Sequence, residues 1–350
     1  MSNINEEYKL VSQREAVTKS YKKLQSDRKR EWGLGGISTG IKDIDLSIGG
    51  FLPQKINIFA ARSGIGKTAL VNSFIAGGST VRDGRKASFL VFSWELDSSL
   101  LVTREVCRLA GVTQGLLLNG SKLLGEEKLK EIDKIYKKCT EYEVQYQQIS
   151  TDINVVTKLV DEFTEQCKIK DKEDGLERQP VIIIDFINMS KALTNTLKTY
   201  QMLEFASGAK QSANRTGSAY AILAQLGRGA DEKAMPTRND LADSRSLEDM
   251  ADSVSLFHRP EYNNVPLIYN PKTGEEDTNS EGKILLIVVK SREFGTRMVL
   301  MNVDIKHFRF WSIGTNWDYD FYPEYSRKQF WMDHFGLRQD ETQLKLDQQK

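Results

Sequence analysis

The residues best suited to chemistry form one short run, Ala61-Arg62-Ser63-Gly64-Ile65-Gly66-Lys67-Thr68. It matches the P-loop pattern G-x-x-x-x-G-K-[ST], except that alanine replaces the first glycine. In a P-loop, backbone N–H groups and the positive end of the following helix converge on phosphate oxygens. Lys67 adds a charge at the β- and γ-phosphates, and the Thr68 hydroxyl ligates Mg²⁺. We therefore predict an ATP site formed by Arg62, Ser63, Gly64, Ile65, Gly66, Lys67, Thr68 and Ala69.

The segments that flank this run have the composition that a P-loop requires. Residues 55–60 before it are mostly apolar, as in a buried strand, and residues 68–75 after it continue as a helix. This strand, loop and helix order is the context in which the pattern binds phosphate. The alternative, an ordinary strand-to-helix turn with a solvent-exposed lysine, does not require all of these features together.

Three further polar residues end strand-type segments: Glu95 follows 88–94, Asp185 closes 180–185, and Gln225 follows 219–224. Ligands of α/β sheets sit at the carboxyl ends of the strands, so these side chains are expected around the triphosphate. Asp185 matches a Walker-B aspartate that holds Mg²⁺, and Glu95 is a candidate general base for the attacking water. The Gln225 amide suits a sensor of the γ-phosphate. Taken singly, each is also typical of a solvent carboxylate or a loop-capping amide.

Two cations near the end of the chain suggest a second half of the site. Residues 290–295 read Lys-Ser-Arg-Glu-Phe-Gly, and in an extended segment Lys290 and Arg292 project to the same side. Such a pair suits the γ-phosphate of another subunit's site, as an arginine finger supplied in trans. From the residues alone, a solvated charged hairpin is the alternative.

The order of elements predicts an α/β fold with a mostly parallel sheet, helices on both faces and an antiparallel hairpin edge. We expect an N-terminal linker or oligomerisation helix within 1–35, an ATPase domain over 36–313 and an aromatic C-terminal tail over 314–350. Residues 170–179 are polar and are expected to form a loop. The expected helices are 5–31, 98–110, 125–140, 155–168 and 200–215, and the later strands are 253–258, 284–290, 298–305 and 308–312.

Composition restricts the other classes of function. The 350 residues are 39% hydrophobic and 28% charged, as in an ordinary globular protein. The net charge of +1 means that nucleic-acid binding requires basic residues gathered on one surface. Three isolated cysteines and three scattered histidines show no metal-ligand spacing. No secretory signal and no apolar run near 18 residues is present, so a cytoplasmic protein without membrane contact is expected.

Together these motifs resemble the DnaB-type replicative helicases, which have a RecA-like ATPase domain. That family's P-loop begins with alanine, so Ala61 is the residue expected there. Six motifs of the family have a similar segment here, in the same order along the chain. The family's patterns and the similar segments of this chain are T-G-x-x-x-L-D at 39–45, F-S-L-E-M at 92–96, I-D-Y-L at 184–187, S-Q-L-N-R at 224–228, D-L-R-E-S at 240–244 and K-x-R-x-G-x at 290–295.

The resemblance implies an ATP-dependent helicase that forms a hexameric ring, translocates 5′ to 3′ on single-stranded DNA and unwinds the duplex at a replication fork. It implies a helicase loader and a primase as partners, and the cytoplasm of a bacterium or of a phage-infected host as the location. The catalytic residues would be Lys67, Glu95, Gln225, Lys290 and Arg292, and the DNA contacts Arg228, Asp243, Ser244 and Arg245.

Two departures from the family pattern bear on these expectations. The family has arginine where this chain has Ala242, and glycine where it has Arg245, so we expect Arg245 to take over a phosphate contact or DNA to bind more weakly. The family's N-terminal, primase-engaging domain is not recognised here, which suggests a compact, phage-type helicase. Two alternatives remain: a RecA-like recombinase or single-stranded-DNA-binding ATPase that unwinds nothing, and a non-motor protein that uses ATP as a switch.

Overall fold

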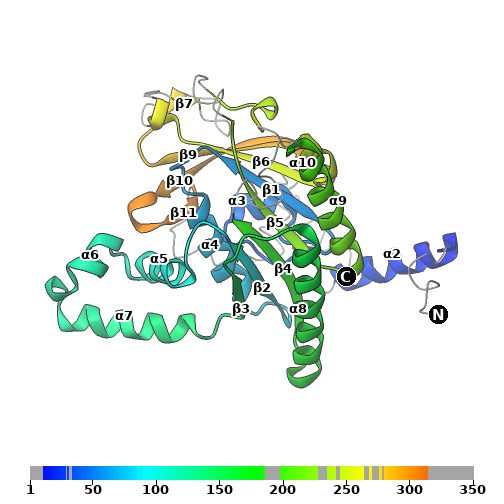
Figure 1. Cartoon of the computed structure of the whole chain (residues 1–350), viewed down its shortest axis with the longest axis horizontal. Coiled ribbons are helices and arrows are strands. Elements are labelled where there is room, and N and C mark those ends of the chain that lie inside the picture. The colour runs from blue at the N-terminus through cyan, green and yellow to red at the C-terminus, as the bar shows by residue number, and fades with distance from the viewer. Residues whose placement is uncertain are drawn as a thin grey trace, which may run out of the picture. The chain divides into compact units, whose positions relative to one another are not determined.

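The computed structural model centres on a mixed sheet with the strand order β11-β10-β9-β6-β1-β5-β4-β2-β3 (Figure 1). From β6 to β3 across this order, neighbouring strands are parallel, whereas β9, β10 and β11 add an antiparallel edge beside β6. This arrangement confirms the predicted α/β fold. The structure describes residues 11–28, 30, 34–185, 198–227, 235–241, 245–263, 268–269, 276–277 and 280–313.

The strands and helices of the sheet domain alternate along the chain. The strands are β1 (Ile56–Ala61), β2 (Arg85–Ser93), β3 (Val144–Gln147), β4 (Glu177–Asp185), β5 (Ala219–Gln225), β6 (Ser253–His258), β9 (Lys283–Ser291), β10 (Arg297–Asp304) and β11 (Arg309–Ser312), with β7 (Ile268–Tyr269) and β8 (Glu276–Asp277) as a separate pair. The helices are α3 (Lys42–Ile48), α4 (Lys67–Ser79), α5 (Ser98–Ala110), α6 (Gln114–Asn119), α7 (Glu126–Cys139), α8 (Ile153–Asp174), α9 (Lys198–Thr216) and α10 (Arg245–Met250), and short 3-10 turns include η5 (Arg238–Asp240) and η7 (Ile305–His307).

Contacts divide the chain into two units, residues 36–323 and the two terminal segments 1–35 and 324–350. In the second unit the structure describes helix α2 (Gln13–Arg28), which buries none of its residues. Such a helix gains little stability from burial of its apolar side chains, because the stability of a helix in a protein comes mainly from the packing of one face. The predicted aromatic tail, 314–350, lies outside the described residues.

The side chains of β1 show how the sheet forms two hydrophobic layers. Successive residues of a strand point to opposite faces. Ile56 and Ile58 face a core shared with α8, α9 and α10, and Phe59 faces a core shared with α3 and α4. All three side chains are at most 1% exposed. The continuous apolar run in β1 is therefore what a central strand covered on both faces requires.

One sequence expectation was wrong. Residues 170–179 were predicted as a loop, but α8 continues to Asp174 and β4 begins at Glu177. Gly175, with φ of +75°, ends the helix in a left-handed conformation, and its N–H donates to the Asp171 carbonyl. The polar residues of this stretch belong to an ion network, which explains why they lack the apolar periodicity of a helix.

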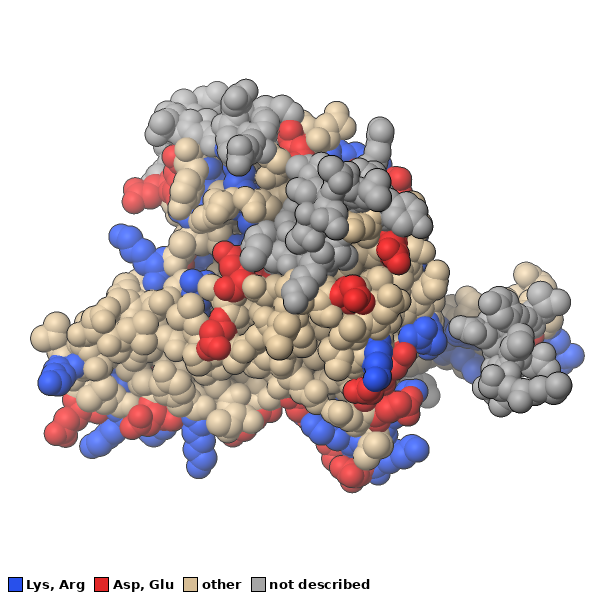
Figure 2. Space-filling view, in the orientation of Figure 1, with Lys and Arg blue, Asp and Glu red and all other residues tan. Residues whose placement is uncertain are grey.

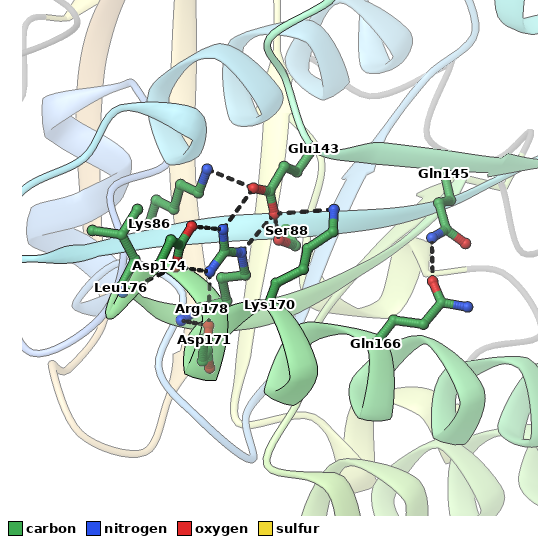
Figure 3. A network of polar contacts seen from close by, with 10 residues as sticks. All are labelled: Lys86, Ser88, Glu143, Gln145, Gln166, Lys170, Asp171, Asp174, Leu176 and Arg178. Atoms are coloured by element: carbon green, nitrogen blue, oxygen red, sulfur yellow. Dashed lines mark hydrogen bonds and ion pairs between the residues drawn. The ribbon is translucent and has the colours of Figure 1, made fainter.

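The centre of that network is Arg178, whose side chain is 3% exposed (Figure 3). Its guanidinium donates to Glu143 at 2.8 and 2.9 Å and also binds Asp171 and Asp174 at the end of α8. Lys86 and Ser88 of β2 bind the same Glu143 carboxylate. Burial opposes ionisation of Glu143, but these donors lower its pKa to about 2. The network thus joins β2, β4, α8 and the start of β3.

This pKa shift predicts a pH-dependent contribution of Glu143 to stability. Because the folded pKa lies below the ordinary value of 4.5, the stabilisation is present above about pH 4.5 and is lost as the pH falls toward 2. Glu143→Gln should lower the free energy of unfolding at pH 7 by about 1–2 kcal/mol, after allowance for solvent screening. The difference from wild type should narrow by pH 4 in urea titrations.

Glu165→Gln is the matched control, because Glu165 forms a solvent-exposed ion pair with Lys168 on the same α8 helix. It should change stability by no more than about 0.5 kcal/mol at either pH. Equal effects of the two substitutions would show that the network around Arg178 contributes nothing beyond an ordinary surface charge.

Candidate nucleotide-binding site

The P-loop lies between β1 and α4, in the central part of the sheet (Figure 1). Ala61 is still the last residue of β1 and is 1% exposed, so its backbone is extended and does not need glycine. Gly64 and Gly66 have φ of +78° and +108°, which side-chain-bearing residues rarely adopt. Gly66 is the N-cap of α4, so the N–H groups of the first helical turn open onto the loop.

Lys67 is the first residue of α4, and its Nζ donates to the carbonyls of Ala61 and Arg62 at 3.3 and 3.2 Å. Burial lowers the pKa of Lys67, while the charges of Asp185 and Glu95 act in the opposite direction. The ammonium is thus held back over the loop by carbonyls and faces two carboxylates. The two carbonyl contacts hold the ammonium beside the loop, where it is available to an anion.

The register of the sheet brings the predicted residues to the same edge. Ala61 pairs with Gln225 across β1 and β5, and Ser93 pairs with Asp185 across β2 and β4. The Trp94 N–H, next to Glu95, donates to the Asp185 carbonyl at 3.0 Å. The ends of β1, β2, β4 and β5 therefore carry the P-loop, Glu95, Asp185 and Gln225 on adjacent strands.

Asp185 has the properties of a ligand for a divalent cation. It is 1% exposed, and neither carboxylate oxygen accepts a hydrogen bond from the described residues. Burial raises its pKa to about 6, opposed by the nearby Thr68 hydroxyl, while the Glu95 carboxylate adds to the rise. A buried carboxylate with two unpaired oxygens beside a hydroxyl fits a hard divalent cation such as Mg²⁺.

Arg104 is a residue of this site that the sequence reasoning missed. It projects from α5, its pKa is lowered mainly by burial, and the charges of Asp185 and Glu95 act on it in the opposite direction. Its guanidinium lies 5.2 Å from the centre of the Phe308 ring, in a cation–π contact. The available signal was its position nine residues after Glu95, on the helix that follows the same strand.

Lys290 and Arg292 lie together, but away from the P-loop of their own chain. β9 is antiparallel to β6, so Ser291 pairs with Ser253, which in turn pairs with Asn57 near the start of β1. The P-loop follows Ala61, about four residues farther along β1, which corresponds to roughly 13 Å of extended strand. The two cations are therefore at the amino ends of the parallel strands, whereas the nucleotide site is at their carboxyl ends.

The predicted DNA contacts are mostly beyond the described part of the chain. Arg228, Asp243 and Ser244 lie outside it, and Arg245 is described only as the first backbone position of α10. On the face drawn in Figure 2, Lys and Arg side chains are interspersed with Asp and Glu, and no broad surface of one sign is visible among the described residues.

Residues 36–312 match the model of the DnaB-like helicase C terminal domain. The chain belongs to this DnaB-like family. The match covers the P-loop, Glu95, Asp185, Gln225, Lys290 and Arg292.

Curated relatives of this DnaB-like chain are replicative helicases of bacteria. "Replicative DNA helicase DnaB" of Leifsonia xyli subsp. xyli is 26% identical over 299 residues, which are 85% of this chain and 60% of the relative. "Replicative DNA helicase DnaC" of Bacillus subtilis is 23% identical over 80% of this chain and 57% of the relative. The chain thus spans about three fifths of the length of these curated relatives.

Solved structures show the same fold. The "ATPase Domain of G40P" superposes with a TM-score of 0.71 at 18% identity, covering 87% of this chain and 100% of the other. A DnaB-like replicative helicase, described with its interactions with primase, gives a TM-score of 0.69 at 17% identity and is covered over 68% of its length.

None of the helices that the structure describes combines the length and the apolar character that a membrane span requires.

Two glycines of the P-loop give a prediction that separates backbone strain from steric overlap. A Cβ at Gly66 would lie 2.5 Å from Cδ1 of Ile305 and 3.0 Å from the Phe310 ring, whereas a Cβ at Gly64 would have no atom within 4 Å. Gly64→Ala should cost about 1–2 kcal/mol from the left-handed backbone alone. Gly66→Ala should cost at least about 1 kcal/mol more, because Ile305 and Phe310 must also move.

Urea unfolding measures both costs, and binding of a fluorescent ATP analogue reports on the loop. Gly66→Ala should also weaken nucleotide binding more than Gly64→Ala, because Gly66 caps the helix whose N–H groups are predicted to bind phosphate. Equal stability of the two variants would contradict the packing of Ile305 and Phe310 on the loop.

Proposed function

We propose that this chain is the ATP-hydrolysing motor of a hexameric replicative helicase that translocates on single-stranded DNA, 5′ to 3′, and separates the duplex at a fork. The observation that carries this proposal is the separation of the two halves of the site. The P-loop, Glu95 and Asp185 lie at one end of the parallel strands, and Lys290 and Arg292 at the other. A cation pair that is remote from its own nucleotide suits a neighbouring subunit's nucleotide.

In this proposal ATP binds between adjacent subunits. Backbone N–H groups of the P-loop and Lys67 hold its phosphates, and Arg292 of the next subunit stabilises the charge that develops on the γ-phosphate. Glu95 orients and deprotonates the attacking water. Thr68 and Asp185 would hold Mg²⁺, which neutralises phosphate charge when bound. Gln225, whose strand adjoins the P-loop strand, would report the presence of the γ-phosphate to the segment that follows it.

The DNA-binding part of the proposal rests on the family resemblance and on charge. We propose that residues 227–246 line a central pore and that Arg228, Asp243, Ser244 and Arg245 contact DNA. A chain with a net charge of +1 has no excess of basic residues, but six copies around an axis can collect a few cations into a positive channel. The pore alone needs to be basic.

Partners and location follow in the same way. One solved relative is described with its interactions with primase, and we propose a primase and a helicase loader as partners of this chain in the cytoplasm of a bacterium or of a phage-infected host. Helix α2 buries none of its residues, and both Leu24 within it and Val11 just before it are exposed. This exposed apolar surface suits a segment that docks on a neighbouring subunit. A RecA-like recombinase or a single-stranded-DNA-binding ATPase with the same fold remains the second candidate.

Strand displacement on a forked duplex tests the helicase directly. Wild type should displace the strand with ATP, and Lys67→Ala should abolish both displacement and hydrolysis because the phosphates lose their main side-chain charge. Arg292→Ala should lower kcat for hydrolysis by about 10³-fold or more without preventing nucleotide binding. DNA-stimulated hydrolysis with no displacement would instead identify the recombinase or binding protein.

Mixed oligomers test whether Arg292 acts in trans. Lys67→Ala subunits cannot hydrolyse ATP but still carry Arg292, and Arg292→Ala subunits have an intact P-loop. Mixing the two should restore part of the hydrolysis at interfaces where a good P-loop meets a good arginine. If Arg292→Ala alone hydrolyses normally in assembled oligomers, the assignment in trans is wrong.

Salt dependence tests the proposed pore. Affinity for single-stranded DNA should fall steeply with salt, because each phosphate contact releases condensed counterions, with a slope in log Kd against log salt of about 0.7 per contact. Fluorescence anisotropy of a labelled oligonucleotide between 50 and 300 mM salt, roughly the range over which such slopes are measured, gives this slope. A flat response would contradict binding through the phosphate backbone.

A further inference from the structure

The side chains of Lys290 and Arg292 are bound to the last turn of α10. Lys290 Nζ donates to the carbonyls of Glu248 and Asp249 at 2.5 and 3.2 Å, and Arg292 Nη2 donates to the Asp249 carbonyl at 3.1 Å. The last carbonyls of a helix have no partner within the helix and carry its negative dipole end. The two cations therefore act as the C-terminal cap of α10.

Asp252 fixes the same contact from the other side. Its carboxylate accepts from Arg292 Nη1 at 3.3 Å and from Lys210 of α9 at 2.8 Å, and its backbone carbonyl accepts from the Arg292 N–H at 3.0 Å. The Ile56 N–H at the start of β1 donates to this carboxylate as well, at 3.0 Å. Arg292 is thus held where α10, α9 and β1 meet.

The pairing of β9 with β6 is irregular next to the cations. Val254 pairs with Lys290, but Ser255 pairs with Val288, so Val289 is an extra residue in β9. A bulge of this kind bends the strand and re-aims the side chains beside it. Here it comes directly before Lys290, whose ammonium reaches the end of α10.

An ion pair connects α10 to the segment before it. Arg238 of η5 binds the carboxylate of Glu248 in α10, whose side chain is 7% exposed. Between these two elements lie residues 241–244, which include the proposed DNA contacts Asp243 and Ser244. Glu248 therefore binds Arg238, in the segment before α10, through its carboxylate and Lys290 through its backbone carbonyl.

We propose that Glu248, paired with Arg238, is a positioning residue that links the DNA segment to the cation pair Lys290–Arg292 through α10. This inference rests on the proposed function, because it takes that pair to be the finger and residues 227–246 to bind DNA. Glu248 and Arg238 touch neither nucleotide nor reacting atoms; they set where α10 and its capping cations lie.

The physical basis is competition for the same cations. In the proposed contact, Lys290 and Arg292 turn from the carbonyls of α10 toward a neighbouring subunit's phosphates. When they leave, α10 loses its C-terminal cap, and a helix of six residues has little stability of its own. Its displacement then moves the segment joined to it by Arg238. Conversely, DNA that draws this segment away releases the cations, as linkage requires.

Removal of the ion pair from either side tests the link. The full-length variant Glu248→Gln keeps the backbone carbonyls that bind Lys290, so its basal hydrolysis should stay within about twofold of wild type. Arg238→Met removes the same ion pair from its other partner. The stimulation of hydrolysis by single-stranded DNA should fall at least about fivefold in each, the lower end of typical coupling between sites. The double variant should be no worse than either single one, because both remove the same contact.

Arg215→Met is the matched control, since Arg215 forms an ion pair with Asp161 that joins α9 to α8 in the same way but far along the chain from α10. It should leave stimulation unchanged. A second readout is the change in affinity for single-stranded DNA caused by a non-hydrolysable ATP analogue, which should shrink by the same factor in Glu248→Gln.

The outcomes separate this inference from the proposed function. If wild-type hydrolysis does not respond to DNA, the proposed function fails and the inference fails with it. If wild type responds and Glu248→Gln and Arg238→Met respond equally well, the helicase proposal stands and the positioning role is wrong. If the losses of DNA stimulation in the two single variants add up in the double variant, the positioning role is also wrong, because two residues that act through one ion pair cannot have independent effects.

Discussion

The register of the parallel strands is the constraint on which the rest of the molecule depends. Ala61 lies beside Gln225, and Ser93 beside Asp185, because the apolar faces of β1, β5, β4 and β2 must align to bury both hydrophobic layers. A slip by one residue would turn every side chain of a strand to the other face. The same packing that stabilises the sheet therefore places a loop, two carboxylates and an amide at one edge.

The charged groups at this edge are buried or partly buried close to one another. Asp185 is buried without hydrogen-bond partners among the described residues, and Lys67 and Arg104 are partly desolvated beside it. Burying unpaired charge is costly, and the opposite charges of Lys67, Arg104, Asp185 and Glu95 offset part of this cost. At the other end of β2 and β4, Arg178 shows the contrasting case, in which three carboxylates satisfy one buried guanidinium and nothing remains to be bound.

The antiparallel edge places a second group of charged side chains at the end of the sheet opposite the P-loop. β9 returns alongside β6 and carries Lys290 and Arg292 to the amino ends of the strands, where Asp252 and the last carbonyls of α10 hold them. A side chain there cannot serve the P-loop of its own chain. The contacts of this cation pair join it to α10, and through the Arg238–Glu248 ion pair to the segment that precedes α10.

The sequence alone determined the P-loop, the alternation of strands and helices, and the residues at the strand ends, because spacing and periodicity are local properties. Where a local signal was weak, it misled: the polar end of α8 looked like a loop because Asp171 and Asp174 serve Arg178 of the next strand. Only the tertiary structure decided that Arg104 lies over the Phe308 ring and that Lys290 and Arg292 cap α10. Those contacts join segments distant along the chain, and no short-range pattern encodes them.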